Sequence, residues 1–135
     1  MKLSEIIAET IRLARAVRWP PRESSFWRTA IICGDHVRIN PATIPELHEL
    51  HAFLRKQTVG VLFAMTAIMY LGRDGHDDHR YDFLKSYTQI SEFCENTDEA
   101  PDFLLVKVPL PDYLERGLDV LVAEGLDVDE LLGSM

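Results

Sequence analysis

The sequence lacks a hydrophobic run long enough to cross a bilayer. Its longest such run, residues 59–71 (VGVLFAMTAIMYL), has thirteen residues and one plainly polar side chain, Thr66. As a helix rising about 1.5 Å per residue it would be roughly 20 Å long, whereas the hydrocarbon core of a membrane is about 30 Å thick. A helix that is apolar on all sides is instead typical of a protein core. We therefore predict a buried central helix and no membrane contact.

Cysteine is also scarce, with only Cys33 and Cys94 in the chain. The first residues, MKLSEII, place Ser4 and Glu5 where a secretory signal would need its apolar segment, which predicts a cytoplasmic protein. In that compartment two cysteines are expected to be reduced and buried thiols, and not a disulfide.

Motifs of the common enzyme classes are missing as well. The chain has no Gly-x-Ser-x-Gly elbow, no glycine-rich phosphate loop and no dinucleotide-binding fingerprint. We therefore predict a protein that is not an enzyme and serves as a protein-interaction or regulatory module.

The net charge of −8 is unevenly distributed along the chain. Residues 1–40 contain seven Lys/Arg against four Asp/Glu, whereas residues 98–135 contain two against ten. An acidic protein binds phosphate backbones and anionic lipids poorly, so we predict neither nucleic acid nor membrane as a partner. The basic and acidic parts either dock on one another, within a chain or between chains, or form two independent solvated surfaces.

Hydrophobic periodicity predicts a mainly α fold, a small bundle of helices around the central one. We expect a single domain over residues 1–135, with a basic N-terminal helix and the segment after it in residues 1–40 and the helical core in residues 41–135. In residues 29–39, β-branched residues flank Gly34-Asp35 and predict a short β-hairpin. The alternative is a helix that continues from residue 26 to residue 33.

Capping signals predict where several helices begin and end. Ser4 is the expected N-cap of the first helix, and Thr43 with Glu46 forms a capping box. Gly72 is expected to end the central helix as its C-terminal cap. Gly60, in the first turn of the same helix, is expected to let a neighbouring backbone approach closely.

Five residues of the N-terminal part are candidates for contact with a protein partner, or with a second copy in a homodimer. Arg12, Arg15 and Arg18 could bind an acidic partner or fold onto the acidic helix expected near Glu115. Phe26 and Trp27 are adjacent large aromatics that cannot both face the same way, so one of them is predicted to be exposed.

Two His-x-x-His pairs support an alternative function as a metal-binding protein or metal-dependent enzyme. His48 and His51 form one pair, and His76 and His79 form the other. Residues three apart share one face of a helix, so each pair could offer two imidazoles to zinc or another divalent metal. The competing interpretation is four solvated histidines, since the spacings of known zinc motifs are absent. No other cofactor is predicted.

About residues 50–122 resemble a known family. A helix that ends in Tyr70-Leu71-Gly72-Arg73 is followed by a charged helix, by Leu104-Leu105 and Pro109-Leu110, and by the segment DYLERGL at residues 112–118. This order is similar to the bacterial family named domain of unknown function 3775. The resemblance implies a small, mostly helical bacterial protein without an assigned activity, and it supplies no catalytic residues.

Overall fold

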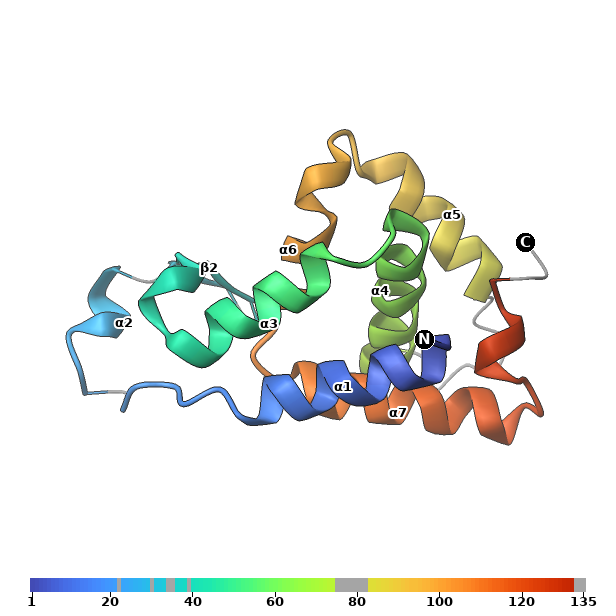
Figure 1. Cartoon of the computed structure of the whole chain (residues 1–135), viewed down its shortest axis with the longest axis horizontal. Helices are drawn as coiled ribbons and strands as arrows, with labels where there is room; N and C mark the ends of the chain where they lie inside the picture. Colours follow the sequence, from blue (N-terminus) through green and yellow to red (C-terminus); the bar gives the residue numbers. More distant parts are fainter. Residues whose placement is uncertain (22, 30, 34–35, 39, 75–82, 133–135) are drawn as a thin grey trace.

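Helix α4 (Val59–Asp74) lies at the centre of a mainly α structure (Figure 1). The computed structural model describes residues 1–135 except 22, 30, 34–35, 39, 75–82 and 133–135. Residues 62–69 of α4 are all buried, and the helices that pack against it are α7 (Leu110–Ala123), α5 (Phe83–Phe93) and α6 (Ala100–Leu105). The predicted fold class and the predicted buried central helix are confirmed.

Helices α1 (Leu3–Arg15) and α7 lie side by side and run in opposite directions along one edge of the molecule (Figure 1). The other neighbour of α1 is α3 (Pro45–Arg55), which also packs against α6. The apolar face of α1 follows the helical repeat, and its one buried polar residue, Thr10, donates its hydroxyl to the Ile6 carbonyl at 2.8 Å. The basic helix α1 and the acidic helix α7 therefore pack on one another within one chain.

Both interpretations of residues 26–39 hold in part. Helix α2 (Phe26–Thr29) is a single turn, and β1 (Ile31–Cys33) then pairs with antiparallel β2 (His36–Arg38), with Ile32 opposite Val37. The buried Val37 donates its N–H to the Val106 carbonyl at 2.8 Å, so the pair of strands is attached to the end of α6. The predicted turn at Gly34-Asp35 lies outside the described residues.

Two predicted N-caps are wrong. Ser4 lies inside the first turn of α1, where its N–H and hydroxyl donate to the Asp129 carboxylate at 2.8 and 2.9 Å. Thr43 ends the short 3₁₀ helix η1 (Pro41–Thr43) and donates its hydroxyl to the Asn40 carbonyl at 2.7 Å, while Ile44 is the N-cap of α3. The Ser4 hydroxyl therefore bonds to a residue far away in the sequence, and the Thr43 hydroxyl bonds to a residue three positions before it. Neither side chain caps the helix that it was predicted to begin.

Gly72 and Gly117 lie at a close contact between the backbones of α4 and α7. Gly72 is buried inside α4, which continues to Asp74, so the prediction that Gly72 caps the helix is wrong. A Cβ atom at position 72 would overlap the Tyr113 carbonyl oxygen and lie 2.7 Å from the Gly117 nitrogen. The absence of a side chain at both positions therefore allows the two backbones to come into contact.

The C-terminus of α7 is closed by a glycine cap. Gly125 has a φ of 76°, and the N–H of Leu126 donates to the Leu121 carbonyl at 2.9 Å. A left-handed glycine followed by this longer hydrogen bond is the Schellman motif. It turns the chain toward the last 3₁₀ helix, η3 (Val128–Glu130), which contacts α1.

The Asp129 carboxylate of η3 connects the two ends of the chain. Its hydrogen bonds from the backbone and the hydroxyl of Ser4 lower its pKa below the ordinary value of 3.8. A group with a lowered folded-state pKa contributes stability above its unfolded pKa and loses that contribution as the pH falls. Because the carboxylate also lies at the positive end of α1, its charge is favourable there.

We expect Asp129→Asn to lower the free energy of unfolding at pH 7 and to have a smaller effect at pH 3, because the contribution of the charge is lost as the pH falls below 3.8 toward the lowered folded-state pKa. Urea unfolding followed by circular dichroism at both pH values measures the difference. Glu130→Gln is the matched control, because Glu130 is an exposed acid in the same turn. An equal loss of stability at pH 7 and pH 3 would contradict a role for the charge.

Candidate functional site

A groove opens between three helices on the surface of the core. Its floor is formed by the buried Thr66 and the half-buried Tyr70 of α4, one wall is α5, and the other wall is α6. The cavity has a volume of about 230 Å³. We call it the α4–α5–α6 groove, and its lining residues are Thr66, Tyr70, Ser86, Gln89, Ile90, Phe93 and Phe103.

Most of the lining of the α4–α5–α6 groove is aromatic or aliphatic. Thr66, on the floor, donates its hydroxyl to the Leu62 carbonyl at 2.7 Å, so its polar atom is engaged within α4. Ile90 is buried, whereas Phe93 is 83% exposed at the rim. The groove therefore presents apolar surface to solvent, and its rim carries an aromatic ring that the fold itself does not bury.

Tyr70 lies on the floor of the groove, and two cationic side chains contact its ring. The Arg73 guanidinium carbon lies 4.7 Å from the ring centroid, and the Lys107 ammonium lies 5.9 Å from it. These distances are typical of cation–π contacts, which hold the ring in place from α4 itself and from the segment after α6. The groove is therefore lined mainly by apolar side chains, and at Tyr70 it borders Arg73, which also pairs with the Asp74 carboxylate at 2.8 Å.

A second cavity, of about 230 Å³, lies where α3 meets α4, next to the 3₁₀ helix η2 (Thr97–Glu99). Its lining includes charged and amide side chains, among them Arg55, Gln57 and Asp98. Gln57 donates its side-chain N–H to the Phe53 carbonyl at 3.1 Å. This amide group is therefore engaged with the last turn of α3. This cavity is polar and lacks an exposed aromatic ring, so it is the weaker candidate.

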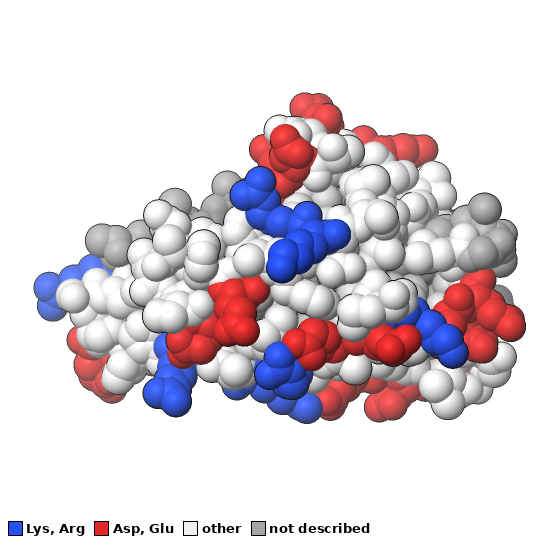
Figure 2. All heavy atoms as spheres, viewed as in Figure 1, with Lys and Arg blue, Asp and Glu red and all other residues white. Residues whose placement is uncertain are grey.

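The three predicted contact arginines form ion pairs within the chain. Arg12 pairs with Glu9, Arg15 of α1 pairs with Glu115 of α7, and Arg18 lies 4.0 Å from Glu46. The hydrogen bond from Arg12 lowers the pKa of Glu9. Figure 2 shows basic and acidic side chains alternating along the edge where α1 and α7 lie. Of the alternatives for Arg15, the structure shows folding onto the acidic helix.

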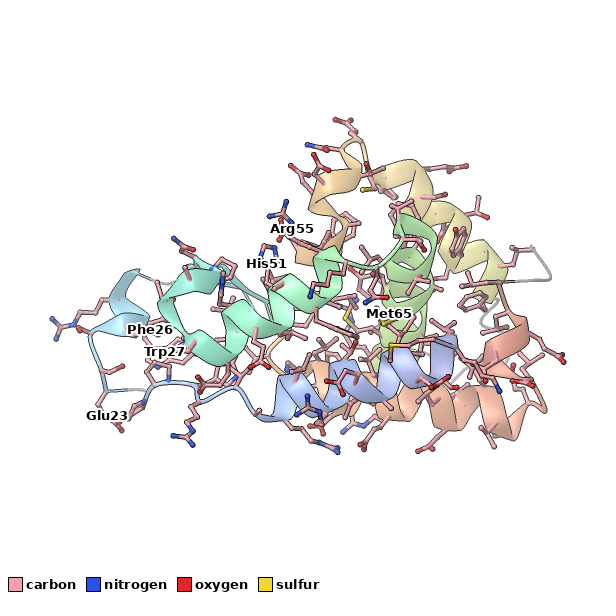
Figure 3. The ribbon with its side chains drawn as sticks, viewed as in Figure 1. Glu23, Phe26, Trp27, His51, Arg55 and Met65 are labelled. Atoms are coloured by element: carbon pink, nitrogen blue, oxygen red, sulfur yellow. The ribbon has the colours of Figure 1, made fainter. Side chains whose placement is uncertain are left out.

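Phe26 and Trp27 are half-buried and pack against each other (Figure 3). Their ring centroids are 5.1 Å apart in a T-shaped arrangement, and Trp27 also stacks on Trp19 at 6.0 Å. The Trp27 indole N–H donates to the Pro20 carbonyl at 2.9 Å. The aromatic cluster thus holds α2 against the segment after α1, and neither ring is fully exposed.

The first histidine pair lies on α3, where His48 is exposed and His51 is half-buried beside α6 (Figure 3). The Nε2 atom of His51 lies 3.6 Å from a carboxylate oxygen of Asp102. Within the described part of the chain, no three His, Cys, Asp or Glu side chains gather closely enough to hold a metal ion. His76 and His79 lie outside the described residues, so the convergence of all four histidines stays a prediction.

Cys94, at the end of α5, is half-buried, and it is a free thiol. Burial, and to a lesser degree the nearby Glu99, raises its pKa. Its sulfur donates to the Asn96 carbonyl at 3.2 Å. A thiol with a raised pKa is a poor nucleophile. The side chain is only half-buried, whereas full burial was predicted. The side chain of Cys33 is outside the described part of the structure.

Comparison of the chain with protein-family models, with curated proteins and with solved structures gives no match. The resemblance to the domain of unknown function 3775 family therefore stays a prediction. In the described residues, no helix is long and apolar enough to span a membrane.

Proposed function

We propose that this protein is a non-enzymatic protein-interaction module, and that the α4–α5–α6 groove receives an apolar side chain of a partner polypeptide. The main support is Phe93, which is 83% exposed at the rim of this groove. Exposed aromatic surface beside an apolar groove marks interaction sites, because leaving it in water is unfavourable.

The size of the groove supports a side chain as its occupant. Small-molecule pockets usually measure about 300–1,000 Å³, whereas this cavity measures about 230 Å³. A single aromatic or large aliphatic side chain is of the right order for such a space. Protein interfaces commonly gain most of their binding energy from a few anchors of this kind inserted into pockets.

The proposal is tested with N-acetyl-phenylalaninamide, which mimics one aromatic residue of a partner. In a titration followed by amide NMR, we expect saturable shifts at Tyr70, Ser86 and Gln89, and none at the exposed Val122 of α7. Phe103→Ala removes part of one wall and should weaken probe binding by about two- to tenfold, the equivalent of one aromatic pair. Shifts absent from the groove, or stronger at the polar cavity beside η2, would contradict the proposal.

A further inference from the structure

We infer that the partner that fills the α4–α5–α6 groove is a second copy of this chain, which inserts its own Phe93. This inference rests on the proposed function and names the partner for the same groove. A two-fold dimer brings the same patch of both copies together, so the patch must be complementary to itself. Here one face carries both the projecting ring of Phe93 and the cavity beside it.

The spacing along α5 allows this insertion. Lys85, Gln89 and Phe93 are four residues apart, so they form one ridge on the exposed side of the helix. If two copies of α5 pair in antiparallel fashion about Gln89, Phe93 of one copy lies level with Lys85 and Ser86 of the other. Ser86 and Gln89 both line the groove. Phe93 of each copy would therefore meet the groove of the other copy.

The charges on α5 match the same register. Lys85 and Glu92 are both exposed. In the antiparallel pair about Gln89, Lys85 of one copy lies within one residue of the level of Glu92 in the other, and the symmetry repeats the contact. Opposite charges thus meet at both ends of the interface, while the two lysines lie about 12 Å apart along the helix axis. A parallel arrangement would bring identical charges together.

The size of the interface predicts a dimer that dissociates on dilution. Helix α5 has 11 residues and is thus about 16 Å long. An interface formed by this helix and the walls of the groove is expected to bury less than about 1,200 Å² of surface in total. Weak and transient complexes have interfaces of this size. Phe93 is then the residue whose loss has the largest effect, since aromatic anchors that fill a pocket dominate such interfaces.

Sedimentation equilibrium over about 5–500 µM tests the inference, because the monomer mass is 15.4 kDa. We expect the average mass of the wild type to rise with concentration, and Phe93→Ala to weaken dimerisation at least tenfold. The fold should tolerate this change, since the ring is exposed. Val122→Ala, at a site 73% exposed on α7, is the matched control. A constant mass of one monomer would overturn the inference.

Charge exchange tests the register independently. Lys85→Glu and Glu92→Lys should each weaken the dimer, and the double variant should restore it, because the opposite charges then meet again with their positions exchanged. Failure of the double variant to restore the dimer would overturn the antiparallel pairing.

The phenylalanine probe separates the two proposals. Applied to Lys85→Glu, which should weaken the dimer at a residue outside the groove lining, the probe should still bind the groove. Binding of the probe with a monomeric wild type would refute the second copy and leave the proposed function intact. Absence of both dimer and probe binding would refute both.

Discussion

Gly72→Ala is expected to lower the free energy of unfolding by about 3 kcal/mol or more, at the upper end of overpacking substitutions. The new Cβ would overlap the carbonyl oxygen of Tyr113 and lie 2.8 Å from its carbonyl carbon. These are backbone atoms of α7, so no rotamer change relieves the overlap. The helices must move apart, which opens the buried contact between α4 and α7 along its length. Urea denaturation followed by helical circular dichroism measures the loss.

Gly117→Ala should have an effect of similar size from the other side of the same crossing. Its Cβ would overlap the carbonyl oxygen of Ile68 and lie 2.7 Å from the Ile68 Cγ2 atom. Because both substitutions separate the same two helices, we expect the double variant to lose less stability than the sum of the single variants. A strictly additive loss would indicate two independent distortions.

Gly60→Ala is the matched control, since it replaces a glycine of the same helix. The nearest atom to the new Cβ is the Tyr87 hydroxyl at 3.4 Å, an ordinary van der Waals distance. Alanine is also the better helix former, by about 0.5–1 kcal/mol. We expect Gly60→Ala to leave the stability unchanged or to raise it slightly. If it destabilises as much as Gly72→Ala, the close contact with α7 is not the cause.

The helices and the core could be predicted from the sequence because their signals are local. The apolar run of residues 59–71 does form the buried helix α4, and a glycine, Gly125, follows the last turn of α7 where that helix ends. Periodicity and a glycine after the last apolar turn report on the residues nearby and need no knowledge of the fold. Mainly α architecture follows from such signals alone.

The roles of the glycines could not be predicted in the same way. Gly72 follows an apolar helix and precedes charged residues, which is also the pattern of a C-terminal cap, yet the helix continues through it. Gly60 was the glycine expected to admit a neighbouring backbone, but the close approach occurs at Gly72 and Gly117. Which glycine meets another backbone depends on how the helices cross, and no local pattern records that.

The candidate site was missed for a related reason. Ile90 and Phe93 are both apolar and three positions apart, so helical periodicity alone places them on one face, yet only Ile90 is buried. The groove exists because α5 and α6 pack on different sides of α4 and leave Thr66 and Tyr70 between them. Likewise, the bond from Ser4 to Asp129 joins residues 125 positions apart. Each of these features depends on tertiary packing, which a single sequence does not display.

Ile68→Ala is expected to lower the free energy of unfolding by about 2–5 kcal/mol, the usual range for a buried isoleucine. Ile68 is fully buried in the middle of α4, and its Cγ2 atom reaches the site where Gly117 lacks a side chain. The lost methyl groups would leave a cavity at the crossing of α4 and α7, which close-packed backbones cannot fill.

Val59→Ala is the matched control, because Val59 is also β-branched, lies on α4 and is 38% exposed. It should cost well under 1 kcal/mol in the same urea titrations. Equal losses for the two variants would mean that α4 is stabilised by helix formation along its length and not by burial of its central residues against α7.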